Sequence, residues 1–486
     1  MAAHLAPADR PRPAAWRWGA LVAAVLALPG CETLGGIVGS GPPQGSPGFV
    51  RGFLGGVATE DPAAALAARQ VLSAGGSATD AAVAAGFSLA VTLPSRVGVG
   101  GGGACLVFDP AKAAVEALTF LPGPRPATAE ADRPAAVPLL ARGLFALHTR
   151  KPVRPFEELI AAAEQYARFG TEVSRGLAAD LAAVSGPLFA DPSARAVFAR
   201  ADGSPRQPGD PLLQPELAAT LGQLRLAGVG DLHQGSLARR LEQVSPNAGA
   251  GLTLDQLRAA LPDLAQPFDL PSRGGDRIAF LPPPADGGIA AAAAFEAMRT
   301  GASPEAALAR GLAVVQTLRS QGGDPAVVLA AAGLPEARPA ALPASAGLVV
   351  FDRQGVAVTC AFTLNNLFGT GRMAPGMGFL LAAAPGLGTV QPPLLSAAIA
   401  YNANLKAFRM ALAGSGQQDA PLAVAGPAAL HLLRGRPLAE AIGTGAPGMA
   451  RVQVANCLNY LPGYPDRCVV MTDPRGAGVA LGAVDN

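Results

Sequence analysis

A cluster of glycines follows an alanine-rich stretch near the start of the chain, and this order constrains the fold most strongly. Residues 75–109 read GGSATDAAVAAGFSLAVTLPSRVGVGGGGACLVFD. Ala78 to Ala90 predicts a thin helix that must be packed on every side, and Ala104 to Phe108 predicts an apolar strand. The glycines at 98 and 100–103 let the backbone between them approach a neighbour closely. We therefore expect a buried helix that crosses into a sheet.

The same order argues against a nucleotide site. A phosphate-binding loop follows a strand and opens a helix, whereas these glycines follow a helix and open a strand. A nucleic-acid partner is not expected either, because the net charge is only +2 and no Lys/Arg run is interleaved with aromatic residues.

Length and composition predict a large folded protein. The chain has 486 residues, of which 50% are hydrophobic and 15% are charged, so it can bury a large core in two to four domains or in one large α/β unit. The 60 glycines and 46 prolines are scattered evenly among periodic segments. That distribution favours a loop-rich enzyme over disorder, and we find no internal repeat.

The N-terminus has the pattern of an export signal. Arg10, Arg12 and Arg17 precede an apolar run at 18–28 that is too short to span a bilayer comfortably. We predict a lipoprotein-type signal peptide over residues 1–30.

The sequence LPGC at 28–31 is similar to a bacterial lipobox, in which the cysteine is lipidated and becomes the new N-terminus. We therefore expect lipidation of Cys31, followed by a flexible Gly/Pro/Ser-rich tether over residues 31–48. The protein would be anchored to a membrane of the bacterial cell envelope and face the periplasm. Secretion into the periplasm with an incidental cysteine is the alternative.

Export makes the other cysteines interpretable. Cys457 and Cys468 flank NYLPGYPDR, a turn-rich segment, and we predict a disulfide that closes this loop in an oxidising compartment. Cys105 and Cys360 lie in apolar strand-like runs and are expected to be small core residues.

No zinc pattern is present. His148, His233 and His431 are isolated from any cysteine or acidic partner at ligand spacing, so each is expected on the surface or in the core. We predict neither a metal nor another cofactor.

Helix and strand patterns alternate along the chain. Asp61-Pro62 opens a helix that runs to Gly75-Gly76, residues 157–169 are amphipathic, and the capping box at 253–256 opens a third helix. The middle of the chain is mostly helical, and the spacer from Gly333 to Ala344 is the clearest internal boundary. Strands are expected at 278–281, before a long Ala-rich helix, and at 348–351, 356–364, 378–383, 408–413, 469–472 and 479–484.

Three segments together resemble one enzyme family. The glycine crossing, PPPADGG at 282–288 and LVVFDRQGVAVTCAFTLNNLFGTGRMAPGMGFLL at 348–381 resemble γ-glutamyltransferases, also called glutathione hydrolases, in those places and in that order. The resemblance covers roughly Val50 to the C-terminus. It implies the α/β, four-layer αββα sandwich of N-terminal-nucleophile hydrolases. It also implies one precursor that cuts itself into a large-subunit-like region, 49–344, and a small-subunit-like region, 345–486, which intertwine as one domain.

The resemblance implies a specific chemistry. In the family, a threonine that starts the small subunit attacks its own preceding peptide bond, and its freed α-amine then activates its hydroxyl to accept the γ-glutamyl group as an acyl-enzyme. Counting back from Asp352 places Ser345 at this nucleophile. Thr363 matches the second threonine, which hydrogen-bonds the nucleophile, and Asn365 matches the asparagine that holds the substrate's α-amino group.

The substrate-binding residues of the family are largely replaced. Leu121 stands where the family has an arginine, and residues 380–387 contain no acidic pair. Arg96 is the candidate replacement for the missing cation, with a surface arginine flanked by glycine as the alternative.

Two other family features map onto the small-subunit-like region. The serine pair falls at Leu394-Leu395 or, with a one-residue slip, at Leu395-Ser396, which makes Ser396 a substrate-binding candidate. In the expected oxyanion loop, residues 414–418, the backbone N–H groups of Gln417 and Gln418 are the candidate donors.

These observations leave three readings open. The first is a γ-glutamyltransferase-family enzyme that acts on a γ-glutamyl amide such as glutathione, with impaired or altered activity. The second is an unprocessed pseudoenzyme that binds a partner or a small ligand at the envelope. The third is an amidase or acylase of the same superfamily, with an apolar pocket suited to the substituted leucines.

Overall fold

A computed structural model of the chain describes residues 52–123, 131–331, 344–385 and 393–482. The chain divides into residues 1–44 and a compact unit from Gly45 to Asn486, and the description below concerns the second. The predicted signal peptide, the tether and Cys31 lie outside the described residues, as does most of the spacer at 333–344.

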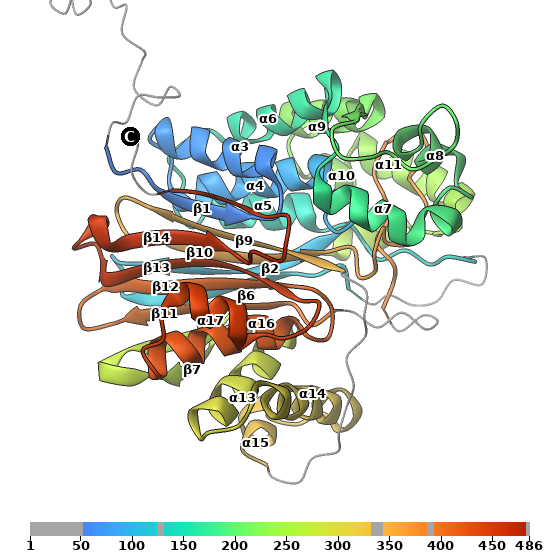
Figure 1. Cartoon of the computed structure of the whole chain (residues 1–486). Helices are drawn as coiled ribbons and strands as arrows, with labels where there is room; N and C mark the ends of the chain where they lie inside the picture. The colour runs from blue at the N-terminus through green and yellow to red at the C-terminus, as the bar shows by residue number, and fades with distance from the viewer. Residues whose placement is uncertain (1–51, 124–130, 332–343, 386–392, 483–486) are drawn as a thin grey trace, which may run out of the picture. The chain divides into compact units, whose positions relative to one another are not determined.

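Two antiparallel sheets form the centre of the unit (Figure 1). In spatial order, the first sheet contains β15 (Val479–Leu481), β1 (Gly55–Thr59), β9 (Ser345–Asp352), β10 (Ala357–Thr363), β2 (Gly102–Asp109), β3 (Ala114–Phe120) and β6 (Asp263–Ala265). The second contains β14 (Cys468–Thr472), β13 (Arg451–Leu461), β12 (Ala407–Ser415), β11 (Ser396–Asn402), β8 (Arg277–Phe280) and β7 (Phe268–Pro271). Strands β4 (Thr171–Glu172) and β5 (Pro211–Leu212) pair separately.

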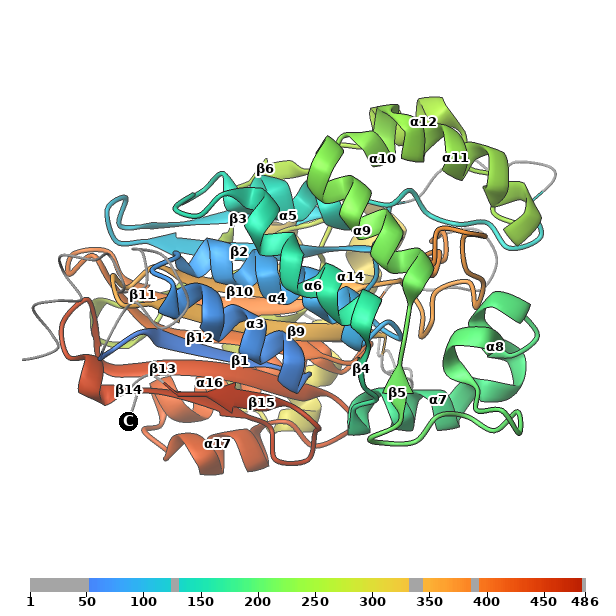
Figure 2. The ribbon, with the colours of Figure 1, turned by 90° about the horizontal axis from the view of Figure 1, so that it is seen from above.

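Helices cover the outer face of each sheet. Figure 2 shows α3, α4, α6 and α9 lying across the first sheet. This side comprises α3 (Pro62–Ser73), α4 (Ala78–Thr92), α5 (Leu140–His148), α6 (Phe156–Phe169), α7 (Arg175–Leu188), α8 (Pro192–Phe198), α9 (Pro215–Ala227), α10 (Asp231–Gln234), α11 (Ser236–Val244) and α12 (Leu254–Ala259). The second sheet carries α13 (Gly287–Arg299), α14 (Pro304–Gln321), α15 (Pro325–Ala330), α16 (Ala420–Ala428) and α17 (Leu438–Gly445). The layers therefore run αββα, as the sequence predicts.

Strand alternation builds the core between these layers. Along β2, Ala104, Leu106 and Phe108 face the second sheet, whereas Cys105 and Val107 face the helices above the first. Both faces of the strand are buried, which explains its unbroken apolar sequence. Two apolar layers thus fix the first sheet in place.

Helix α4 and the glycines after it match the prediction. Every residue of α4 is buried, and Ser77 with Asp80 forms a capping box at its start. A Cβ atom at Gly101 would lie 2.4 Å from the carbonyl oxygen of Thr363, and one at Gly102 would lie 2.0 Å from that of Phe120. Because neither gap admits a side chain, the glycines let the crossing lie directly against β10 and β3.

The predicted strand at 378–383 is not formed. Leu380, Leu381 and Ala383 make only isolated bridges, to Met373, Gly100 and Ala135 respectively. Left-handed backbone at Gly376 and Gly378 turns the chain just before this segment, so it crosses its neighbours instead of running along one of them. The structure also contains β11, which we did not predict because its alanines give little strand signal.

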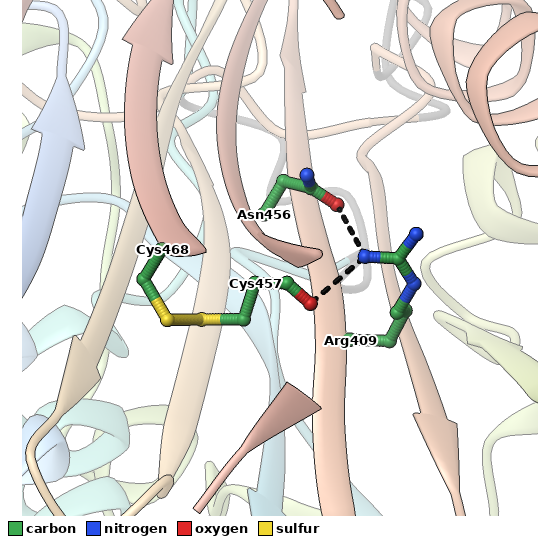
Figure 3. Close-up of a disulfide and its surroundings, with 4 residues drawn as sticks. All are labelled: Arg409, Asn456, Cys457 and Cys468. Carbon is green, nitrogen blue, oxygen red and sulfur yellow. Dashed lines mark hydrogen bonds between the residues drawn. A yellow bond between two sulfur atoms is a disulfide. The ribbon is translucent and has the colours of Figure 1, made fainter. Parts of the chain in front are cut away.

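Two disulfides lie within the described residues. Cys457 on β13 pairs with Cys468 on β14, and Figure 3 shows Arg409 donating to the carbonyl oxygen of Cys457 beside it. The expectation for the other two cysteines was wrong in one respect, because Cys105 and Cys360 are buried but bonded to each other. They stand directly opposite in the register of β2 and β10, with Cα atoms 4.1 Å apart.

His148 is buried, which is one of the two predicted locations, and its Nδ1 lies 3.0 Å from Asp80 Oδ1, a partner that we did not predict. The pair is 68 residues apart in sequence, so no local spacing reveals it. His233 is buried, and burial lowers its pKa to about 4. Across the described residues, no cluster of three His, Cys, Asp or Glu side chains is arranged to hold a metal, and none of the helices there is long and apolar enough to span a membrane.

Candidate active site

Three strand ends in the first sheet bring the predicted nucleophile next to the glycine crossing. Ser345 is the first residue of β9 and stands opposite Thr363, the last residue of β10. Thr363 in turn stands opposite Gly102, the first residue of β2. The glycines therefore abut the strand end that carries Thr363, which explains why this segment and the site occur together.

The hydroxyl of Ser345 is held by the second sheet. Its Oγ donates to the carbonyl oxygen of Gly416 at 2.8 Å and lies 3.0 Å from the N–H of the same residue. Gly416 follows β12 directly and has a φ of 141°, a conformation that L side chains rarely adopt. Ser345 is fully buried, so both of these contacts are shielded from solvent.

Thr363 contacts the peptide bond that precedes Ser345. Its Oγ1 donates to the carbonyl oxygen of Ala344 at 2.6 Å and accepts from the N–H of Asn365 at 2.8 Å. The carbonyl that self-cleavage would attack therefore already has a hydroxyl donor on its oxygen.

The side chain of Asn365 is committed to the backbone. Its Nδ2 donates to the carbonyl oxygens of Pro122 at 2.7 Å and Ala383 at 3.0 Å. The residue has a φ of 64° and is almost fully buried. It thus joins the segment that carries Leu121 to the segment of Ala383, where the family has an acidic pair and this chain has none, and it brings both to the site.

Ser396, Gln417 and Gln418 lie in the loops and strand ends of the second sheet. Ser396 begins β11 opposite Gly414, and its Oγ donates to the carbonyl oxygens of Gly287 and Leu394. The carbonyl of Gln417 accepts from Leu394 N–H at 3.1 Å. In this loop the N–H that faces Ser345 Oγ belongs to Gly416, one residue before the predicted oxyanion pair of Gln417 and Gln418.

Arg96 differs from both sequence expectations. Its side chain is 13% exposed, so it is not a surface arginine. Its Nε and Nη2 donate to the two carboxylate oxygens of Asp180, and its Nη1 donates to Glu60, each at 2.7 Å. A substrate carboxylate would have to compete with both of these acids. The arginine is therefore already committed within the protein.

Glu60 connects this ion cluster to the nucleophile's strand. Its Oε1 accepts from the N–H of Gly347, two residues after Ser345, at 2.9 Å. Burial raises the pKa of Glu60, whereas Arg96, a hydrogen bond from Ser415 and the Gly347 N–H act in the opposite direction. These three neighbours stabilise the charged form of Glu60, whereas burial disfavours it.

Comparison with known proteins identifies the family. The family model of gamma-glutamyltranspeptidase matches residues 64–318. The chain belongs to the γ-glutamyltranspeptidase family. Glutathione hydrolase 2 of Arabidopsis thaliana is 29% identical over 249 residues, which cover 49% of this chain and 43% of that protein. The Acylase ACY 1 proenzyme of Pseudomonas sp. (strain SE83) is 30% identical over 262 residues, which cover 49% of this chain and 46% of that protein.

A solved structure supports the same fold. The cephalosporin acylase from Bacillus halodurans superposes with a TM-score of 0.69 at 18% identity, covering 89% of this chain and 96% of that chain. At this identity the likeness concerns the fold alone. The sequence matches to the glutathione hydrolase and to the acylase span less than half of the length of each.

The sequence analysis missed three residues that the structure connects to Ser345 or to its strand, directly or through Arg96. Gly416 was placed in the expected loop, but its direct contact with the Ser345 hydroxyl was not foreseen. Glu60 and Asp180 were not considered, although an acidic pair at 60–61 that ends an apolar strand is a visible signal. Asp180 gives no local signal, because it reads as one polar residue in a helix.

Proposed function

We propose that the protein is an acyl-transferring amide hydrolase of the γ-glutamyltranspeptidase family that cleaves itself between Ala344 and Ser345. One observation carries the proposal. Thr363, at the end of β10, donates to the carbonyl oxygen of Ala344, and Gly416, directly after β12, accepts from the hydroxyl of Ser345. The substrate would be a γ-glutamyl amide such as glutathione or a related amide.

Self-cleavage follows from this arrangement. Ser345 Oγ adds to the carbonyl carbon of Ala344, and Thr363 Oγ1 donates to the oxygen on which negative charge develops. The C–N bond then breaks as the nitrogen of Ser345 takes the proton that Oγ released, and water hydrolyses the resulting ester. The products are a carboxylate on Ala344 and a free amine on Ser345. That amine is the base for the second acylation, with an external amide as the acyl donor.

The substituted pocket residues support a change in specificity. A γ-glutamyl donor carries an α-carboxylate and an α-ammonium, and leaving either charge unpaired in a pocket costs about 3–5 kcal/mol. Leu121 offers no charge, and the Nδ2 of Asn365 is already used by two backbone carbonyls. We therefore expect acyl groups without a free α-carboxylate to react faster than γ-glutamyl groups.

Denaturing electrophoresis with intact-mass analysis tests the proposal. The wild type should give two fragments that break at Ser345, and Ser345→Ala should give one full-length chain. Ser88→Ala is the matched control, since Ser88 is a buried serine whose hydroxyl has no hydrogen-bond partner. A single band from the wild type, with no release of chromophore from a γ-glutamyl anilide, would refute the proposal. Fragments without that activity would direct the assay to a panel of acyl anilides.

An unprocessed binding protein is the second candidate. It is favoured by the contacts of Ser345 Oγ, whose hydrogen bonds in the described structure both involve the backbone of Gly416. A backbone carbonyl accepts a hydrogen bond but does not take the proton from an attacking hydroxyl. In this case the wild type and Ser345→Ala give the same full-length band, and neither releases chromophore from any anilide.

A location in the cell envelope is the remaining part of the proposal. It rests on the N-terminal signal pattern and on Cys31, which precedes the tether. Cells given a radiolabelled fatty acid should incorporate the label into the wild type and not into Cys31→Ser. Equal labelling of the two proteins would contradict the anchor.

A further inference from the structure

A buried group of three charged side chains lies beside the candidate nucleophile, and no step proposed above uses it. Glu60 follows β1, Arg96 lies in the loop after α4, and Asp180 belongs to α7. The side chains are 8%, 13% and 3% exposed respectively. Placing three charges in the interior is expensive unless each is paired, so a specific role is expected for them.

The carboxylate of Glu60 faces the two segments that hold Ser345. It accepts from Gly347 N–H on β9, and a hydrogen bond from Ser415, the last residue of β12, lowers its pKa. Gly347 is two residues after Ser345, and Ser415 is the residue before Gly416. Glu60 therefore binds the strand that carries Ser345 directly, and it lies close enough to Ser415, whose Oγ donates to the carbonyl oxygen of Arg451 at 3.5 Å, for that hydroxyl to lower its pKa.

The two segments are also closely packed at this point. A Cβ atom at Gly347 would lie 3.0 Å from both the Cβ atom and the carbonyl oxygen of Ala413 on β12, so Gly347 lies directly against that residue. Thr59 Oγ1 donates to the carbonyl oxygen of Gly347 at 3.2 Å from the same side as Glu60. Small movements of Gly347 should therefore be transmitted directly to the position of Ser345.

Backbone alternation places the reacting nitrogen on the same edge. In a strand, the N–H groups of residues i and i+2 point to the same side. Because Gly347 N–H points toward Glu60, the nitrogen of Ser345 faces that edge of β9 as well. The amine released by self-cleavage would thus emerge on the edge where the charged group lies.

We propose that Glu60, Arg96 and Asp180 form a positioning unit that holds Ser345 against Gly416, with Glu60 making the contacts and Arg96 fixing Glu60. Arg96 is suited to this role, because its planar guanidinium binds Asp180 through two nitrogens and leaves the third for Glu60. Asp180 also accepts from Ser95 Oγ, which anchors the far end of the group. The inference rests on the proposed function of Ser345.

Glu60→Gln is the primary test. The change is nearly isosteric and leaves the Arg96 to Asp180 pair intact, so the fold should be retained. Glutamine has one acceptor oxygen, whereas the carboxylate accepts from both Arg96 and Gly347. We expect the rate constants of self-cleavage and of the p-nitrophenol burst from p-nitrophenyl acetate to fall by about 10–100-fold.

Hydrogen exchange provides a readout independent of catalysis. In Glu60→Gln, amide exchange at Gly347 and Gly416 should become about tenfold faster, while exchange elsewhere in β10 and β12 is unchanged. Arg225→Met is the control, because it removes an ion pair with Glu164 between α6 and α9 and touches neither segment. That variant should leave the burst and both amides as in the wild type.

A double-mutant cycle tests whether Arg96 acts through Glu60. If it does, Arg96→Met combined with Glu60→Gln should be no slower than the slower single variant. Additive losses would overturn the role of Arg96. Should Arg96→Met fail to fold, Arg96→Lys replaces it in the cycle, because it keeps one positive charge beside the two acids.

The outcomes separate this inference from the proposed function. If the wild type cleaves and Glu60→Gln matches it in rate and exchange, the positioning unit is refuted and the function of Ser345 stands. If the wild type neither cleaves nor gives a burst, the proposed function fails, and a positioning role in catalysis fails with it. Faster amide exchange at Gly347 and Gly416 in Glu60→Gln would then show only that Glu60 stabilises these two segments.

Discussion

The two ends of β9 are both buried, but they satisfy their polar groups in different ways. At the Asp352 end, one carboxylate accepts from the backbone N–H groups of Ala78, Gln354 and Val356 at 2.9–3.1 Å. It thereby joins the N-terminus of α4 to the turn between β9 and β10. Besides these backbone groups, the side-chain amide of Gln354 donates to the same carboxylate at 3.3 Å.

At the Ser345 end, side chains hold the backbone instead. Thr363 donates to the Ala344 carbonyl, and Glu60 accepts from Gly347 with Arg96 behind it. Backbone N–H groups at the start of a helix and in a turn stabilise a carboxylate that accepts from them. Burying three charged side chains in the interior, by contrast, is costly. The Asp352 end therefore joins elements of the fold, whereas the proposed function assigns the Ser345 end to a reaction.

The largest expected effect comes from one hydroxyl on β10. Thr363→Val should slow self-cleavage by about 10²–10³-fold, because it removes the donor to the Ala344 carbonyl oxygen. Thr359→Val is the matched control: Thr359 is also buried on β10, and its Oγ1 donates to the carbonyl of Leu412 at 2.8 Å. It should lower the free energy of unfolding by about 1–3 kcal/mol without slowing cleavage of the folded chain.

Intact-mass time courses, normalised to the folded fraction, measure this difference. Equal cleavage rates in Thr363→Val and Thr359→Val would remove the distinction between a structural threonine and a reactive one. The two ends of β9 would then have to be regarded as alike.

The next effect concerns stability at the opposite end. Asp352→Ala should lower the free energy of unfolding by about 2–4 kcal/mol, because it leaves the Ala78 N–H at the start of α4 and buried turn N–H groups without their acceptor. Ser345→Ala should cost only about 1 kcal/mol while abolishing cleavage. Urea denaturation and cleavage assays on both variants test this. A stability loss in Ser345→Ala as large as that in Asp352→Ala would contradict the division of roles.

The sequence predicted the parts of this arrangement that local patterns encode. Helix α4 follows from its alanines and capping box, and the glycine crossing follows from residues that cannot carry a side chain there. Ser345 and Thr363 were matched to family positions by resemblance, and the structure places them opposite each other in the sheet. In each case the signal lies within a few residues.

The remaining features depend on contacts between distant segments. The Cys105 to Cys360 disulfide needs the register of β2 against β10, and the contact of Ser345 with Gly416 needs the packing of two sheets. Arg96 was singled out as a cation near the site, but its partners come from Glu60 and from Asp180 on α7. No sequence pattern encodes which acids meet an arginine in the interior.

The smallest expected effect is a pH dependence that arises at the Asp352 end. Burial raises the pKa of Asp352 to about 6, against 3.8 for the ordinary carboxyl, although three backbone N–H groups and Lys151 act in the opposite direction. A raised pKa means that the folded state binds this proton more tightly than the unfolded state does. Stability from this group is therefore greatest below about pH 4 and is lost as the pH rises to about 6. The loss corresponds to at most about 3 kcal/mol.

Asp352→Asn isolates this contribution, since the amide does not titrate. The free energy of unfolding of the wild type minus that of the variant should fall between pH 4 and pH 6 and stay constant above pH 7. Urea denaturation at each pH gives the difference directly. A difference that rises with pH over this range would mean that the backbone donors outweigh burial and that the carboxylate is the favoured form. The Asp352 end would then be stabilised by charge, as the Ser345 end is, and the contrast between the two ends of β9 would have to rest on cleavage alone.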